Sequence, residues 1–329
     1  MLIEGRSDAK FAIIQEMTSR DNNLLNITTL CAIAGVSRSG YYNWLKSAPM
    51  REAREERDRR DFQLILEAYK YRGYSKGARS IHMRLLHLKP CVQMNVKKIR
   101  RLMKQYNLRC PIRKANPYRR MAAALRGSTV APNLLNRQFR AFGARKVLLT
   151  DITYLFYSGH KRCYMSVIMD AYTKQVLSYV VSESLEEDFV LETVNLLIEH
   201  HGVALTAETL INSDQGCHYT SKRFIELIQN ANLMQSMSRK ANCWDNAPQE
   251  SFFGHMKDEI DISKCSRFQQ VQTAICDWVD YYNKDRYQWI LAKLSPNEFY
   301  EYSRTGVYPL TCGIPTDKES QENIEDGEE

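Results

Sequence analysis

The chain has 329 residues, which is enough for two or three domains. Hydrophobic residues make up 44% of it and charged residues 26%, as in ordinary globular proteins. No apolar run approaches the ~20 residues needed to cross a bilayer, and the first residues, MLIEGRSDAKF, lack the apolar segment of a secretory signal. We therefore expect a cytoplasmic protein with no membrane partner.

The number and spacing of the cysteines argue against a structural zinc site and against a disulfide-rich fold. The nine cysteines are scattered, and no two of them form a C-x-x-C pair. An odd count in a chain without an export signal predicts reduced, mostly packed thiols. No closely spaced histidine pair accompanies paired cysteines, so a structural zinc site is not expected.

The net charge of +8 divides unevenly along the chain. Residues 1–150 hold 31 Lys and Arg against 10 Asp and Glu, whereas residues 151–329 hold 15 against 28. No acid stands between Glu67 and Asp151, although that interval carries 21 Lys or Arg. Solvated surfaces usually mix both signs. A long polyanion is the natural partner of such a stretch, so we expect double-stranded DNA binding and association with the nucleoid.

The first 48 residues contain a predicted helix-turn-helix. In ITTLCAIAGVSRSGYYNWL at 27–45, Leu30, Ile33 and Ala34 suit the inner face of a first helix. Gly35 permits the turn, and Ser37 caps a second helix. The second helix of such a unit enters the major groove, although a plain helical hairpin is the alternative. The expected DNA contacts are Arg38, Ser39 and Tyr42.

A helical connector at 49–70 leads to a second helical DNA-binding module at 71–110. Its second helix, NVKKIRRLMKQYNL, has Asn95 as a cap and Val96, Ile99, Leu102 and Met103 on one side. Residues 111–145 form a basic linker that contains Pro and Gly. We expect this part of the chain to contact DNA phosphates through basic side chains, namely Lys97, Lys98, Arg100, Arg101, Lys104, Arg113 and Lys114.

The pattern changes at residue 146, where apolar, β-branched and aromatic runs begin. KVLLTDITYLFY, RCYMSVIMDAY and QVLSYVV predict a three-strand meander. Two short strands, near ETLINSD and LMQSMS, then alternate with helices. This order predicts an α/β ribonuclease-H-like core at 146–260, a mixed five-stranded sheet with flanking helices, preceded by the all-α modules. Helices continue through 261–303, and the acidic tail at 304–329 is expected to be disordered.

Three acids stand in unusual positions within this core. Asp151 interrupts the buried run VLLTDITYLF, where a carboxylate costs several kcal/mol without compensation. Asp214 follows the apolar strand LINS, at the end where ligands gather in α/β sheets. Glu250 lies in the first turns of a helix opened by D-N-A-P at 245–248. An acid on a solvent-facing edge strand is the alternative for Asp151.

Lys257 follows Glu250 by seven residues, which places both on one helix face about two turns apart. Carboxylates without a His or Cys cluster favour hard, oxygen-loving cations, Mg²⁺ first and Mn²⁺ second. Two such ions clamp a phosphodiester in known nucleases and polymerases, and the lysine would reach a phosphate. An ordinary surface pair is the alternative interpretation of Glu250 and Lys257.

Several blocks of the sequence resemble those of insertion-sequence-3-type transposases, specifically the second reading frame product with its retroviral-integrase-like core. The catalytic blocks are T-D-I-T-Y at 150–154, S-D-Q-G-C-H-Y-T-S at 213–221 and C-W-D-N-A-P-Q-E-S-F-F at 243–253. Asp214 and Glu250 are separated by 35 residues, the interval of that superfamily. Matches outside the acids are G-V-S-R-S-G-Y-Y at 35–42, Y-S-K-G-A-R-S-I at 74–81, Y-Y-N-K-D-R-Y-Q-W at 281–289 and L-S-P-N-E-F-Y at 294–300.

The resemblance implies cleavage and joining of DNA at terminal inverted repeats, in a homo-oligomer assembled on the element ends and target. It implies that Asp151, Asp214 and Glu250 bind two metal ions and that Lys257 is the accompanying basic residue. It also implies a possible first-frame helix-turn-helix partner protein. Asp170 is expected to shape a turn, and Asp258 and Glu259 lie near Glu250 but fit the motif less well.

Two other functions fit parts of the sequence. A ribonuclease-H-fold nuclease would cleave without joining, and a DNA-binding regulator would keep a vestigial core. The basic stretch of 83 residues without an acid favours prolonged binding of DNA ends, as strand joining requires. The three acids that the resemblance identifies as catalytic are all present, which argues against an inactive core.

Overall fold

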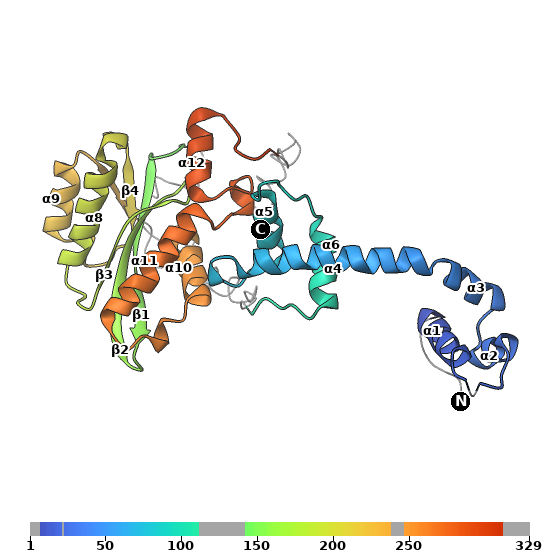
Figure 1. The fold of residues 1–329 in the computed structure, drawn as a ribbon. Coiled ribbons are helices and arrows are strands. Elements are labelled where there is room, and N and C mark those ends of the chain that lie inside the picture. Colours follow the sequence, from blue (N-terminus) through green and yellow to red (C-terminus); the bar gives the residue numbers. More distant parts are fainter. Residues whose placement is uncertain (1–6, 22, 112–141, 238–246, 312–329) are drawn as a thin grey trace, which may run out of the picture. The chain divides into compact units, whose positions relative to one another are not determined.

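The structure is a computed structural model that describes residues 7–21, 23–111, 142–237 and 247–311. The chain divides into two compact units, 1–64 and 65–329, and the long helix α4 (Ala48–Lys70) runs from one into the other. Figure 1 labels the elements. Each unit is described by itself below. No helix among the described residues combines the length and the apolar character required to span a membrane.

In the first unit, two helices joined at Gly35 lie where the helix-turn-helix is expected, and a further helix, α1 (Ser7–Thr18), precedes them. Asn26 caps α2 (Ile27–Ala34), and Gly35 ends it in the left-handed conformation at φ 62°. The Ser37 side chain accepts from the amide of Gly40 and so caps α3 (Arg38–Lys46). The two predicted signals at the turn, Gly35 and Ser37, are confirmed.

The core of this small unit corrects one expectation about α2. Leu30 and Ala34 are buried as predicted, but Ile33 is 52% exposed and Cys31 takes the inward position instead. The reason is α1, which the sequence pattern did not predict. Phe11 and Ile14 of α1 pack against α2 and α3, and so turn a different side of α2 inward.

The second unit begins with the end of α4 and the helical pair α5 (Ala78–Leu86) and α6 (Val96–Gln105). Asn95 caps α6 by accepting from the amide of Lys97, as predicted. The buried face of α6 is formed by Ile99, Leu102 and Met103, while Val96 is half-buried. This amphipathic division leaves most of the basic side chains of α6 exposed.

A mixed five-stranded sheet forms the centre of the second unit, with strand order β3-β2-β1-β4-β5. Strands β1 (Val147–Tyr157), β2 (Lys161–Asp170) and β3 (Val176–Ser182) are antiparallel. Strands β4 (Leu210–Ser213) and β5 (Met234–Met237) add in parallel. The predicted meander and the two later strands are confirmed.

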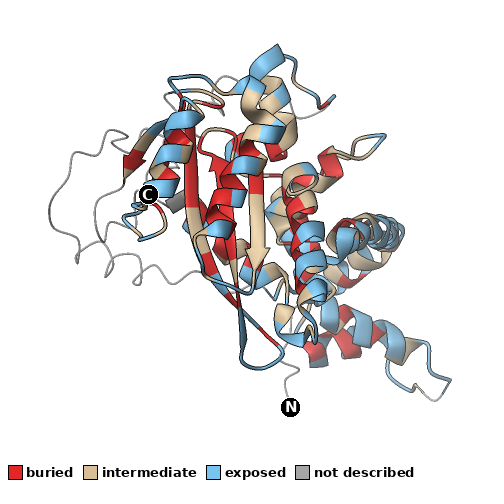
Figure 2. Ribbon diagram, turned by 90° about the vertical axis from the view of Figure 1, so that its left-hand side faces the viewer, coloured by how far each residue is buried: buried red, intermediate tan, exposed pale blue. Residues whose placement is uncertain are grey.

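Helices cover both faces of the sheet (Figure 1). On one face, α8 (Asp188–His201) and α9 (Lys222–Asn230) enclose a core with Leu148, Ile168 and Ile211 of the strands. On the other face, α10 (Ala247–Glu259) and α11 (Phe268–Lys284) enclose Leu149, Leu155 and Met165. Figure 2 shows these strands as the buried centre of the unit.

The C-terminal part corrects the expectation for residues 304–329. Helix α12 (Pro296–Thr305) begins with a Ser295–Glu298 capping box, as the L-S-P-N-E pattern favours. Leu310 is 8% exposed and packs with Leu86 and Leu294, so the predicted tail does not begin at 304. The rest of that tail, from 312, lies outside the described residues.

The cysteines also depart from the expectation of reduced, packed thiols. Cys91 is disulfide-bonded. Six other described cysteines are free, but only Cys31 and Cys163 among them are buried.

Candidate active site

Asp151 lies in β1, the central strand, at the point where this strand leaves its parallel neighbour. β4 pairs with β1 only over Val147–Leu149, so Asp151 stands just beyond the end of β4. The carboxylate is half-buried and accepts from the amide of Ile152 at 2.8 Å. The pKa of Asp151 is raised to about 6, mainly by burial and also by the negative charges of Asp214 and Glu250, against the effect of that amide.

Asp214 follows β4 directly and is exposed, as the strand-end position predicts. The amide of Gly216 donates to its Oδ1 atom at 2.9 Å. A Cβ atom at Gly216 would lie 2.9 Å from that same oxygen, so a larger residue there would require the Asp214 carboxylate to shift. The hydrogen bond from the Gly216 amide favours the present orientation of the Asp214 side chain.

Glu250 lies in the first turn of α10, and the rest of this helix anchors it to the sheet. Phe252, Phe253 and Met256 are buried against β1 and β2 or against α11. The neighbouring Gln249 is fully buried and donates from Nε2 to the carbonyl of Val167. Glu250 points to an exposed position, although partial burial still raises its pKa.

Lys257 lies two turns after Glu250 and contacts β1. Its Nζ atom donates to Oγ1 of Thr153 at 2.7 Å. Partial burial lowers the pKa of Lys257, and the charge of Asp151 opposes that change. Thr153 is a residue that sequence reasoning missed. Strand alternation was the available signal, because Thr153 lies two residues after Asp151 and so on the same face.

The described structure thus brings Asp151 within electrostatic reach of Asp214, Glu250 and Lys257. It does not bring three acids into one closed cluster, since no group of three His, Cys, Asp or Glu side chains among the described residues is arranged to hold a metal ion. The donor set itself, oxygen ligands from three elements, fits a hard divalent cation.

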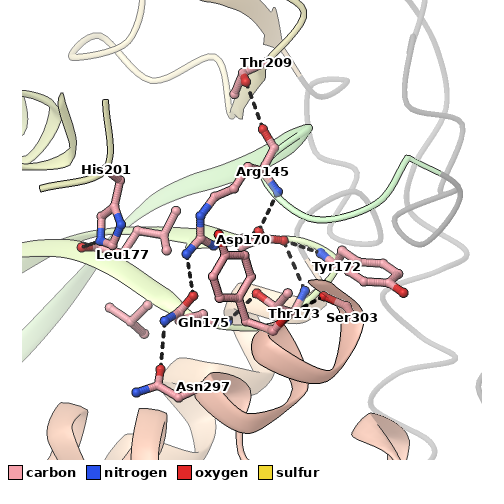
Figure 3. Close-up of polar contacts among 12 residues, drawn as sticks. Arg145, Asp170, Tyr172, Thr173, Gln175, Leu177, His201, Thr209, Asn297 and Ser303 are labelled. Carbon is pink, nitrogen blue, oxygen red and sulfur yellow. Dashed lines mark hydrogen bonds and ion pairs between the residues drawn. The ribbon is translucent and has the colours of Figure 1, made fainter. Parts of the chain in front are cut away.

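Asp170 has a structural role, as expected. Its carboxylate is fully buried and bonds the backbone amide of Arg145 at 2.8 Å and Nη1 of the same residue at 2.9 Å. The amides of Tyr172 and Thr173 donate to the other oxygen and close the turn after β2. Figure 3 shows this network, in which Arg145 also reaches Gln175. All lone pairs are committed to the fold, which leaves none for a ligand.

Glu259 is also engaged within the fold. It forms an ion pair with Arg286 at 3.0 Å and accepts from the indole nitrogen of Trp278 at 2.9 Å. Its side chain is 4% exposed. Glu259 therefore connects α10 to α11, and its carboxylate is not available as the candidate metal ligand in place of Glu250.

The predicted DNA contacts lie on two separate helices. In the first unit, Arg38, Ser39 and Tyr42 are exposed on α3, and the Arg38 guanidinium lies 5.7 Å from the centre of the Tyr42 ring. On α6, Lys98 is half-buried and the other basic side chains are exposed, namely Lys97, Arg100, Arg101 and Lys104. Arg113 and Lys114 lie outside the described residues.

Comparison with protein families assigns both parts of the second unit. Two models described as an integrase core domain match residues 143–243 and 250–303. A model described as an HTH-like domain matches residues 56–116, which include α5 and α6. The predicted core and the second helical module are therefore both matched by family models.

Relatives of known sequence cover most of the chain. The putative transposase InsK for insertion sequence element IS150 of Escherichia coli K12 is 30% identical over 275 residues, which are 82% of this chain and 92% of that protein. The insertion element IS600 uncharacterized 31 kDa protein of Shigella sonnei is 29% identical over 277 residues, or 83% and 97% of the two chains. The HTLV-2 integrase catalytic core domain in complex with magnesium is a solved structure with 15% identity, coverage of 49% and 99%, and a TM-score of 0.36.

The sheet order and the matched models define an integrase-core polynucleotidyl transferase with a helix-turn-helix-like region. Such an enzyme acts on DNA. The extended identity to InsK places the chain more narrowly: it belongs to the IS3/IS150 family of insertion-sequence transposases.

Proposed function

We propose that this transposase cleaves and joins DNA strands at the terminal inverted repeats of its element, using Asp151, Asp214 and Glu250 with Lys257. One observation carries the proposal: the half-buried carboxylate of Asp151 lies in the electrostatic field of both other acids. A buried carboxylate with two like charges near it is unfavourable for stability alone. A site that binds cations explains why the sequence tolerates it.

Asp151, Asp214 and Glu250 would hold two Mg²⁺ ions, with Mn²⁺ as a substitute. When bound, divalent ions activate an attacking oxygen and stabilise a leaving oxygen on phosphorus. The proposal requires the three carboxylates to come closer together on metal binding than they lie now. Glu250 is the acid that we expect to move, because its side chain is exposed.

The protein side chains have distinct tasks in this proposal. The Gly216 amide holds Asp214 in one orientation, and the Ile152 amide does the same for Asp151. Lys257 offers an ammonium beside the acids, where it would neutralise a phosphate of the bound strand. Thr153 keeps that ammonium in place through its hydroxyl.

DNA would be gripped by the exposed residues of α3 and by the basic side chains of α6. Together with Arg113 and Lys114, these cations account for an affinity that depends on counterion release. We further propose that the chain works as a homo-oligomer on its DNA and that a first-frame helix-turn-helix protein assists it. Both proposals rest on the family to which the chain belongs.

The test is a strand-transfer assay with the full chain, Mg²⁺ and a duplex carrying the end of the element. Asp214→Asn should bind this DNA normally yet lose nicked and joined products together. Asp188→Asn is the matched control, because Asp188 is 71% exposed in a surface pair with Arg223. Unchanged processing by Asp214→Asn would support a DNA-binding regulator instead, and nicking without joining by the wild-type chain would support a simple nuclease.

A further inference from the structure

The end of the β1–β2 hairpin carries an unusual set of exposed aromatic side chains. Tyr154 and Phe156 of β1 are each 52% exposed, whereas Leu155 and Tyr157 between and after them are buried. Strand alternation therefore sends the two exposed rings to the face opposite α10 and α11. That face is covered by α8 nearer the middle of the sheet, but the end of the hairpin is exposed (Figure 2).

Cross-strand pairing makes these rings part of one continuous surface. Tyr154 lies directly opposite Tyr164 of β2, and their ring centroids are 5.2 Å apart in an edge-on arrangement. Phe156 lies directly opposite the exposed Arg162. We call these four residues, Tyr154, Phe156, Arg162 and Tyr164, the hairpin stripe. Rings braced against a neighbouring strand lose little conformational freedom when a flat ligand stacks on them.

The segment that carries the hairpin stripe contains cations and no acid. Lys161 and Arg162 begin β2, and no acid occurs in the sequence between Asp151 and Asp170. The acid that follows β3, Glu183, accepts a hydrogen bond from the buried Tyr157 hydroxyl. Aromatic rings beside cations, without acids among them, form the combination that binds single-stranded nucleic acid.

The position on β1 relates the hairpin stripe to the site of chemistry. Tyr154 and Phe156 follow Asp151 by three and five residues, so strand alternation sends their side chains to the sheet face opposite that of Asp151. Beyond Leu149, β1 is paired with β2 alone among the described strands, so a DNA strand could pass from Asp151 round this open side of β1 to the other face.

We propose that the hairpin stripe stacks unpaired bases of the DNA strand that the acids process, after this strand has passed round the open side of β1. This inference rests on the proposed function for its location, but the stacking itself does not require catalysis. A blunt, fully paired duplex offers no free base faces and so should not engage the stripe. Unpaired bases become available where the strands at an element end separate beside a nick.

The experiment uses the full chain and a duplex with a four-nucleotide single-stranded overhang that contains 2-aminopurine. Stacking on a ring quenches 2-aminopurine fluorescence, so the wild-type chain should quench the overhang probe and leave a blunt probe with internal 2-aminopurine unaffected. Tyr154→Ala and Phe156→Ala should each weaken binding of the overhang probe by about 5-fold or more, as expected for the loss of one base–aromatic stack. Binding of the blunt duplex should stay the same.

Two substitutions at Phe156 distinguish base stacking from the effect of apolar bulk alone. Phe156→Trp keeps an aromatic plane and should retain the quench, whereas Phe156→Leu keeps only apolar bulk and should lose it. Phe142→Ala is the matched control, because Phe142 is 48% exposed and lies outside the hairpin. Equal losses in Phe142→Ala and Phe156→Ala, or full quenching by Phe156→Leu, would overturn the proposal.

Stacking can also be distinguished from catalysis and from self-association of the chain. Glu250→Gln should abolish strand processing and still quench the overhang probe, so failure of the proposed chemistry does not imitate failure of stacking. A second copy of the chain is the alternative occupant of the hairpin stripe. If Tyr154→Ala and Phe156→Ala reduce self-association in DNA-free sedimentation while quenching persists, the stripe is a protein interface and the proposal is wrong.

Discussion

The Lys257 ammonium donates a hydrogen bond to the Thr153 hydroxyl at 2.7 Å and thereby joins α10 to the strand that carries Asp151. This contact connects two segments more than a hundred residues apart in the sequence. It places a positive charge beside a carboxylate that two other acids make harder to ionise. The Lys257 ammonium should therefore matter for the chemistry at Asp151.

Lys257→Ala should slow strand cleavage by on the order of 10- to 100-fold, the value of one hydrogen bond to a charged group. Loss of the ammonium removes a phosphate contact and also removes the charge that favours ionised Asp151. Lys257→Arg should recover part of the rate, and Thr153→Val should lose less than Lys257→Ala. Lys264→Ala is the control, because Lys264 is exposed and pairs only with Asp261 in the turn after α10. Wild-type rates from Lys257→Ala in single-turnover assays would refute the role.

Asp170→Asn should destabilise the second unit by about 3–5 kcal/mol, because it leaves the buried Arg145 guanidinium without its counter-charge. Urea unfolding measures the change. Asp188→Asn breaks only an exposed pair and should change stability by about 0–1 kcal/mol. The prediction fails if Asp170→Asn is as stable as the wild type. A stable, folded Asp170→Asn that had lost metal binding would assign Asp170 to the active site instead.

His255 should make folding sensitive to mild acid. The pKa of His255 is lowered to about 4, mainly by burial and also by the charge of Arg286. The unfolded chain therefore binds a proton near pH 6.5, whereas the native chain does not until about pH 4. Stability is fully present above pH 6.5 and should fall by about 1–3 kcal/mol as the pH drops to 4.

The measurement compares wild type with His255→Gln, which removes this titration and leaves the other groups in place. The difference in unfolding free energy between the two chains should shrink or reverse as the pH falls from 7 to 4. A constant difference across that interval would show that His255 is protonated equally in both states.

The basic face of α6 should set the salt dependence of DNA binding. Each phosphate contact adds about 0.9 to the slope of log K against log salt. Joint replacement of Lys97, Lys98, Arg100 and Arg101 by Ala should therefore flatten the slope by up to about 3–4. Lys222 and Lys264 are exposed lysines remote from α6 in sequence, and their joint replacement is the control. An unchanged slope in the fourfold α6 variant would remove this helix from the interface.

Local signals in the sequence predicted much of the fold. Alternation and β-branched composition located the five strands, and caps such as Ser37 and Asn95 lie where the helices begin. The exceptions arise from contacts between distant segments. The inward side of α2 could not be assigned at Ile33, because α1 selects that side by packing against it. Leu310 likewise falls within the range predicted as a tail, although the acids begin only at Asp317, and its packing with Leu86 and Leu294 shows that it belongs to the fold.

The site was predictable to a similar degree. Asp151 and Asp214 were located by their strand context, since a carboxylate in or after an apolar strand is conspicuous. The role of Glu259 was decided by Arg286 and Trp278, which lie on another helix and give no local signal. The hairpin stripe was also missed, because Tyr154 and Phe156 look like ordinary strand residues until their exposure is known.

The central claim is that Asp151, Asp214 and Glu250 together hold the divalent ions, and direct metal binding tests it most closely. Mn²⁺ binding to the full chain on element-end DNA should be measured by electron paramagnetic resonance for the wild type and for Asp151→Asn, Asp214→Asn and Glu250→Gln. We expect two bound ions in the wild type and the loss of at least one in every variant, with DNA binding retained. If any one of the three variants binds Mn²⁺ with wild-type stoichiometry and affinity, that residue is not a ligand and the account is contradicted.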